Sequence, residues 1–227
     1  MSLQFGLGRY QPHPAADVLS NQYGDCKDKH VLLAALLRAI GVPSAPVLIS
    51  AGEPIDPDLP SPGQFDHLIT FVPALDSVWL DATPGVAPFQ FLFVTIRGKQ
   101  ALVIPQDAAP RLARVPVAPP YRTYNRLDAT GTLSDAGRLT TAVRYESRGD
   151  VEVIVRGMFQ QVPEDNWHLF AERLAAVGDL EGTVQSTTAD DPLATRTPFA
   201  CGAPRRHVAR GALVDLCATR AAGRSRG

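Results

Sequence analysis

The sequence predicts an α+β fold in which a helix packs on a short antiparallel sheet, followed by a second, smaller α+β unit. Residues 67–72 and 77–81 are short apolar runs joined by a tight turn, the pattern of a β-hairpin. A proline-rich stretch over residues 106–120 separates these elements from later ones. The apolar residues that recur at helical spacing before the hairpin are Leu33, Leu36, Leu37 and Ile40.

The helix is predicted to begin near Asp25, a favourable N-cap residue, and to stop at Gly41 and Pro43. This places Cys26 in the first turn. The unpaired N–H groups and the dipole at a helix start favour an anion, and such a location can lower the pKa of a thiol. Cys26 is therefore a candidate nucleophile.

The predicted hairpin supplies two partners for such a nucleophile, His67 and Asp81. If the turn centres near residue 75, Asp81 lies opposite Ile69 and diagonal to His67 on the same face. Diagonal neighbours are roughly 7–8 Å apart at the backbone, a gap that an imidazole and a carboxylate can close. Asp66 is a rival partner, but strand alternation directs it to the face opposite His67, so we favour Asp81.

These residue types suit covalent catalysis. Cys26 would attack a carbonyl carbon, His67 would handle the thiol proton and Asp81 would fix the imidazole tautomer. The oxyanion would need a donor, most simply the backbone N–H of Cys26, with Gln22 and the Tyr23 hydroxyl as candidates for a second. Taken singly, a cysteine or histidine is more often a packed or surface residue.

Three further segments belong to the first part of the chain. Residues 44–50 read as a strand, and residues 51–66 as a proline-rich loop that leads to His67. The loop could line a substrate cleft or be a plain solvated connection. Residues 89–96 and 100–104 are predicted to form a second hairpin that turns at Gly98 and Lys99.

The second part is predicted to contain strands at 121–129 and 138–147, helices at 151–162 and 167–177, and a strand at 180–188. His168 is expected on the surface of the second helix. The apolar positions that define the first helix are Val151, Ile154, Val155, Met158, Phe159 and Val162.

The sequence therefore divides into a core over 1–105, a linker over 106–120, an α+β domain over 121–199 and a disordered tail over 200–227. Residues 201–227 contain six Arg and one Asp among small residues and lose strand alternation. Two of the three cysteines, Cys201 and Cys217, lie in this tail, and an odd count gives no disulfide framework.

Composition excludes several classes of protein. A formal net charge of −1 on 227 residues gives no case for binding nucleic acid or a membrane surface. No signal peptide and no apolar run long enough to span a membrane is evident, which leaves the compartment unassigned. There is no Gly-rich phosphate loop and no zinc-ligand spacing, so we expect no cofactor and no metal. Asp25, Asp28 and His30 are close in sequence but spread around the helix axis.

The residues around Cys26, at Gly24–Asp28, together with His67 and the Asp81–Pro84 motif, resemble the transglutaminase-like superfamily, a branch of the papain-like cysteine enzymes. The residue pattern of these motifs is most similar to that of a bacterial multidomain subgroup, which has an N-terminal domain of unknown function. The resemblance implies a Cys-His-Asp triad of Cys26, His67 and Asp81. It also implies that the chain is N-terminally truncated, with a remnant strand at residues 2–6.

The resemblance implies a cysteine enzyme that acts on a peptide or side-chain amide of a peptide or protein substrate through a thioester. We favour hydrolysis over transfer to an amine, because nothing in the sequence marks an amine site. Two alternatives stay open: a non-catalytic binding or scaffold module that keeps the fold, and an acyltransferase for a non-peptide acyl donor. The oligomeric state is not indicated.

Overall fold

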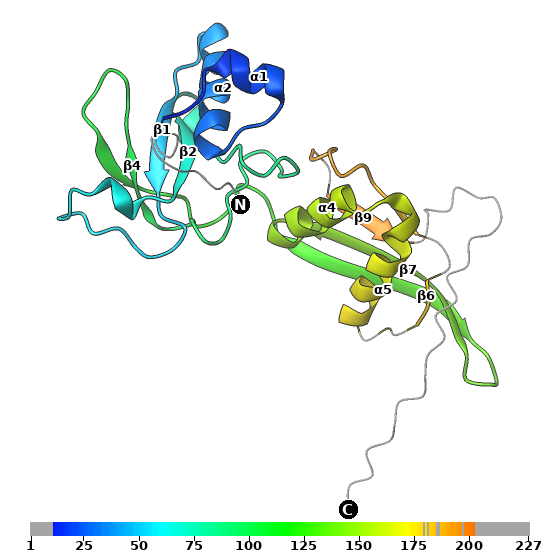
Figure 1. Ribbon diagram of the computed structural model, residues 1–227. Coiled ribbons are helices and arrows are strands. Elements are labelled where there is room, and N and C mark those ends of the chain that lie inside the picture. The colour runs from blue at the N-terminus through cyan, green and yellow to red at the C-terminus, as the bar shows by residue number, and fades with distance from the viewer. Residues whose placement is uncertain (1–10, 179, 181, 185–186, 197, 203–227) are drawn as a thin grey trace, which may run out of the picture. The chain divides into compact units, whose positions relative to one another are not determined.

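The computed structural model describes residues 11–178, 180, 182–184, 187–196 and 198–202 (Figure 1). The chain divides into two compact units between Tyr121 and Arg122. Both units combine helices with an antiparallel sheet, so the α+β class is confirmed. That they are independent domains stays a prediction.

The first unit carries a five-stranded antiparallel sheet in the order β3-β2-β1-β4-β5. Two helices, α1 and α2, precede the sheet in the chain and contact each other, and α2 packs against β2 (Figure 1). The elements are α1 (Ala15–Asn21), α2 (Cys26–Ala39), β1 (Ala45–Ile49), η2 (Pro62–Gln64), β2 (His67–Val72), α3 (Ala74–Ser77), β3 (Val78–Leu80), β4 (Gln100–Val103) and β5 (Arg111–Arg114).

One face of this sheet forms the core of the unit. Its buried apolar side chains come from all the inner strands and from the segment after β3: Ala45, Val47, Ile49, Ile69, Phe71, Trp79, Leu92, Ile96, Ala101, Val103 and Val115. Inward-facing residues alternate along β1, as expected for a strand with one covered face. The core thus fixes the position of β2, which begins at His67.

The helix and the first hairpin agree with the sequence prediction. α2 begins at Cys26 with Asp25 as its N-cap. In the hairpin, Thr70 pairs with Leu80 and Val72 with Val78, the register that puts Asp81 opposite Ile69. The turn itself is a single helical turn, α3. The apolar stripe of α2 is covered less than its spacing suggests, because Leu36 is 55% and Ile40 is 73% exposed.

The predicted hairpin over 89–96 and 100–104 is wrong. Among these residues only Gln100–Val103 forms a strand, β4, and its partners are β1 and β5. Part of the predicted linker over 106–120 belongs to the first sheet instead. Arg111–Arg114 forms β5, the edge strand next to β4. Prolines flank β5 on both sides, which explains why the stretch resembles a linker.

The second unit pairs a four-stranded sheet, in the order β6-β7-β9-β8, with two helices over one face (Figure 1). Val155, Phe159, Phe199 and Cys201 form the buried centre of its core. The elements are β6 (Tyr124–Leu133), β7 (Leu139–Arg148), α4 (Asp150–Gln161), η3 (Glu164–Asn166), α5 (Trp167–Val177), β8 (Thr188–Ala189) and β9 (Phe199–Gly202). Both predicted helices are present, and His168 lies in α5.

Two boundaries in this unit differ from the prediction. Of the strand expected over 180–188, the described part contains only Thr188, the start of β8. Residues 200–202 belong to β9, which inserts between β7 and β8, so the sheet continues past residue 199. Gly131 lies within β6, and an added Cβ there would meet the Thr140 carbonyl oxygen at 2.3 Å.

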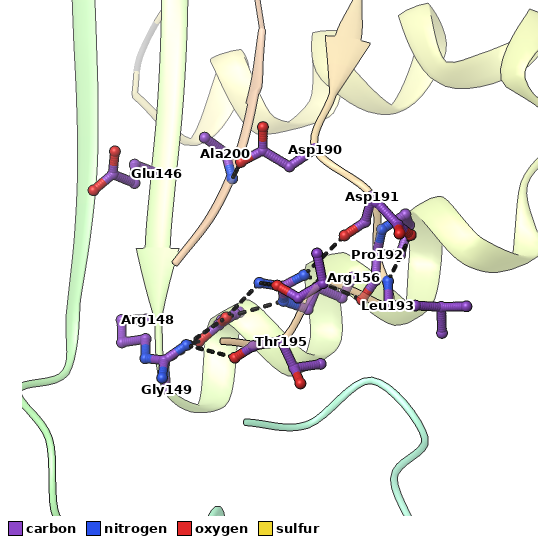
Figure 2. A network of polar contacts seen from close by, with 12 residues as sticks. Glu146, Arg148, Gly149, Arg156, Asp190, Asp191, Pro192, Leu193, Thr195 and Ala200 are labelled. Atoms are coloured by element: carbon purple, nitrogen blue, oxygen red, sulfur yellow. Dashed lines mark hydrogen bonds and ion pairs between the residues drawn. The ribbon is translucent and has the colours of Figure 1, made fainter. Parts of the chain in front are cut away.

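A buried charge network ties α4 to the segment before β9 (Figure 2). Glu152 and Arg156 are fully buried, and their ion pair joins Glu152 Oε1 to Arg156 Nη2 at 2.9 Å. Arg156 also donates to the carbonyls of Asp191, Pro192 and Ala194 at 3.1–3.2 Å. Arg148 adds a second cation, with Nη1 3.1 Å from Glu152 Oε1.

Several predictions lie outside the described residues: the strand over 2–6, Cys217 and the tail beyond residue 202. Within the described part of the chain, no helix is both long enough and apolar enough to cross a membrane.

Candidate active site

The start of α2 is held by a capping box around Cys26. The Asp25 carboxylate accepts the N–H groups of Lys27 (3.0 Å) and Asp28 (3.2 Å), and Asp28 Oδ2 accepts the Asp25 N–H at 3.2 Å. This reciprocal arrangement satisfies backbone donors that have no partner within the helix. The capping box uses the N–H groups of Asp25, Lys27 and Asp28. It fixes the first turn of the helix without using the backbone N–H of Cys26.

Strand β2 and the end of β3 place a histidine and a carboxylate together. His67 Nε2 lies 2.9 Å from Asp81 Oδ2, and the Asp81 side chain is only 2% exposed. The Cys26 thiol lies close enough to the His67 ring to act on its pKa. Because Nε2 is engaged by Asp81, Nδ1 is the ring nitrogen left to face the thiol. Three side chains predicted from separate segments therefore meet.

The surroundings of His67 favour its protonated form. Burial acts to lower its pKa, but the hydrogen bonds and charges of Asp81 and Cys26 outweigh burial and raise the pKa to about 10. Burial also acts to raise the pKa of Asp81. The hydrogen bond and charge of His67, together with the Thr83 N–H, nevertheless hold that pKa below its usual value.

Asp66, the rival carboxylate, lies in a different environment. Its Oδ1 accepts the N–H of Ala51 at 2.7 Å, which fastens the end of β1 to the start of β2. Its described contacts do not include His67. The alternation of the strand thus separates the two acids as the sequence suggested.

The loop that leads into His67 is fastened at both ends. Lys99 Nζ donates to the carbonyls of Ser50 (3.2 Å) and Ala51 (3.0 Å), and also to that of Gly52. Further along, Gln64 Nε2 donates to the Leu59 carbonyl at 2.6 Å. Such bonds restrain an otherwise irregular segment, and they give His67 a fixed approach to the sheet. A role of this loop in substrate binding stays a prediction.

The two candidate oxyanion donors upstream of Cys26, Gln22 and Tyr23, are both exposed. Gln22 follows α1 with a left-handed backbone (φ 52°), and the side chain of Tyr23 is 75% exposed. The Cys26 N–H remains the simplest donor, since it lies on the residue that would attack. Its role and that of a second donor stay predictions.

Sequence reasoning missed two contacts that hold α2 against its neighbours. His30 Nδ1 lies 2.7 Å from Thr70 Oγ1 and joins α2 to β2, and burial lowers the pKa of His30 to about 4. The His13 N–H donates to Asp28 Oδ1 at 2.8 Å. The position of His30, four residues after Cys26 on one helix face, was the available signal.

The other described cysteine is unsuited to nucleophilic chemistry. Burial and the nearby Asp190 raise the pKa of Cys201 to about 12, and it lies in the core of the second unit. Over the described residues, no group of three or more His, Cys, Asp or Glu side chains is arranged to hold a metal ion. Asp25, Asp28 and His30 accordingly form no such group.

Comparison with known families finds a match within the first unit. Residues 8–80 match the family model described as the transglutaminase-like superfamily. This segment contains Cys26 and His67 and ends just before Asp81, so the similarity to the superfamily covers the part of the first unit that carries these two residues. No curated protein and no solved structure matches the chain.

Proposed function

We propose that the protein is a cysteine enzyme that breaks a peptide or side-chain amide bond through a thioester on Cys26. One observation carries this proposal: the ring of His67 lies between Asp81, which it contacts at 2.9 Å, and the Cys26 thiol, which comes from a separate element and acts on its pKa. A nucleophile, a base and a group that orients the base are the parts that covalent acyl transfer needs.

In the first half of the reaction, the Cys26 sulfur attacks the amide carbonyl carbon. A C–S bond forms, and the carbonyl oxygen becomes an oxyanion beside the N–H of Cys26. His67 then gives its proton to the leaving nitrogen, the C–N bond breaks and an amine departs. The acyl group remains on Cys26 as a thioester, while Asp81 holds the ring of His67 in place.

In the second half, neutral His67 takes a proton from water as the water oxygen attacks the thioester. The C–S bond breaks, the product leaves as a carboxylic acid and the Cys26–His67 pair is restored. An amine in place of water would complete a transfer reaction. We favour water, because no feature of the sequence marks a site for an acceptor amine.

Alkylation by iodoacetamide at pH 6 tests the proposal. A free cysteine, with a pKa of about 8.5, reacts slowly at this pH, and we expect Cys26 to react at least ~10-fold faster. His67→Ala should slow the reaction of Cys26 by a similar factor. Cys201→Ser is the matched control and should leave the rate unchanged, since Cys201 is buried in the other unit. Slow labelling of Cys26 that does not depend on His67 would instead support a non-catalytic module.

A further inference from the structure

A single lysine bridges the two segments that carry the ends of the proposed triad. Lys29 is the fourth residue of α2, three positions after Cys26. Its Nζ donates to the carbonyl oxygen of Thr83 at 2.7 Å, across 54 residues of sequence. The same Thr83 donates its N–H to Asp81 Oδ1 at 2.8 Å.

The sheet by itself does not hold Asp81. The last ladder pair of the hairpin is Thr70 with Leu80, so Asp81 lies one residue beyond the end of β3. Its carboxylate is held by His67 on Oδ2 and by Thr83 on Oδ1. The position of Thr83 therefore decides where the carboxylate lies, and Lys29 is the contact from α2 that holds Thr83.

We propose that Lys29 is a positioning residue, which locks the loop that holds Asp81 to the helix that carries Cys26. This rests on the proposed function of the triad. The contacts form a closed circuit from Cys26 along α2 to Lys29, then through Thr83 and Asp81 to His67 and back to Cys26. Small displacements within such a constellation are costly, because about 1 Å of misplacement can reduce a rate 100-fold.

A positional role of Lys29 and a purely electrostatic one predict opposite shifts of the His67 titration midpoint when Lys29 is removed. The titratable groups that act on the pKa of His67 are Asp81 from the end of β3 and Cys26 from α2. If Lys29 acted only as a nearby cation, its removal would make protonation of His67 easier and raise the midpoint of its titration. If Lys29 positions Asp81, its removal loosens the Asp81–His67 bond and lowers that midpoint.

The test compares Lys29→Met with Lys29→Arg and with Arg38→Met, a matched change of another cation on α2. Histidine labelled with ¹⁵N reports the titration midpoint of His67, and iodoacetamide at pH 6 reports the reactivity of Cys26. We expect Lys29→Met to lower the midpoint and to slow alkylation roughly threefold to tenfold. Lys29→Arg, which keeps a cationic donor, should recover most of the loss, and Arg38→Met should match the wild type.

An unchanged or raised midpoint in Lys29→Met would overturn the proposal, as would an equal fall in Arg38→Met. Should Lys29→Met fail to fold, Lys29→Gln keeps a shorter neutral donor and is expected to lower the midpoint in the same direction. The titration is independent of catalysis. A wild-type Cys26 that reacts no faster than a free cysteine would therefore refute the proposed enzyme, while the midpoint would still decide the role of Lys29.

Discussion

The pKa values of His30 and His67 are shifted in opposite directions. Both are largely buried, which by itself disfavours a charged ring. His67 has an acidic partner in Asp81 and a thiol partner in Cys26, and its pKa rises to about 10. Among the described residues, the partner of His30 is the neutral hydroxyl of Thr70, so burial prevails and the pKa of His30 falls to about 4. The partner, not the depth of burial, decides the charge of each ring.

His30 should make the protein sensitive to acid. Its pKa in the folded state, about 4, is below the usual 6.5, so the unfolded chain binds the proton more readily. The contribution of His30 to the free energy of unfolding is therefore fully present above about pH 6.5. It is lost as the pH drops towards 4, which lowers the free energy of unfolding by up to about 3 kcal/mol. Thermal midpoints measured from pH 7.5 to 4.5 should fall less steeply in His30→Gln, while His168→Gln in α5 keeps the wild-type slope. A slope unchanged in His30→Gln would contradict this account.

His67 contributes to stability over the opposite range. Its folded pKa is raised, so the stabilisation from its pairing with Asp81 is complete below about pH 6.5 and is lost as the pH rises through about 10. The acid sensitivity assigned to His30 therefore cannot arise from protonation of His67.

At the scale of elements, α4 shows how far an apolar pattern can mislead about burial. The spacing correctly predicts a helix, and Val155 and Phe159 face the core. Ile154 and Met158, however, are 53% and 44% exposed, whereas Glu152 and Arg156 are fully buried. A buried charge is tolerated there because each of its groups finds a partner (Figure 2).

Glu152→Gln should strongly destabilise the second unit. The change removes the carboxylate charge that pairs with the buried guanidinium of Arg156 at 2.9 Å. Breaking a buried pair in this way costs about 3–5 kcal/mol. Asp128→Asn, which breaks the exposed pair with Arg126, is the control and should leave the free energy of unfolding almost unchanged, because solvent screens that pair. Urea unfolding followed by tryptophan fluorescence measures both, and equal effects would refute the role of burial.

At the scale of the whole molecule, the residues proposed to act all lie in one unit. Cys26, His67 and Asp81 precede the division at Tyr121, and the contacts that hold them also come from this unit. The second unit has its own core and its own sheet. The chemistry is therefore expected to need only the first unit, whatever the second contributes to recognition.

A fragment of residues 1–121 tests this expectation. If the unit folds alone, Cys26 in the fragment should be alkylated at pH 6 within about twofold of its rate in the full chain, because no contact of the site is removed. Circular dichroism establishes that the fragment is folded before the rates are compared. A folded fragment with a much slower rate would show that the second unit helps to order the site.

Features decided by neighbouring residues could be predicted from the sequence. The start of α2 depends on Asp25 and Asp28, which cap each other across three positions. The register of β2 with β3 follows from the short turn between them, and this register placed Asp81 near His67. The interacting groups lie 3 residues apart in the cap and 14 apart across the hairpin, so the chemistry of one continuous segment is sufficient to specify the geometry.

Features that join distant segments were decided only by the tertiary structure. β5 lies in a proline-rich stretch and becomes a strand because β4 offers it an edge. β9 takes its place between β7 and β8 although residues 200–202 look like part of a tail. Lys29 finds Thr83 across 54 residues. A local pattern specifies which conformation a segment prefers, but the partner that satisfies its backbone or its charge comes from elsewhere in the chain and is fixed only when the core forms.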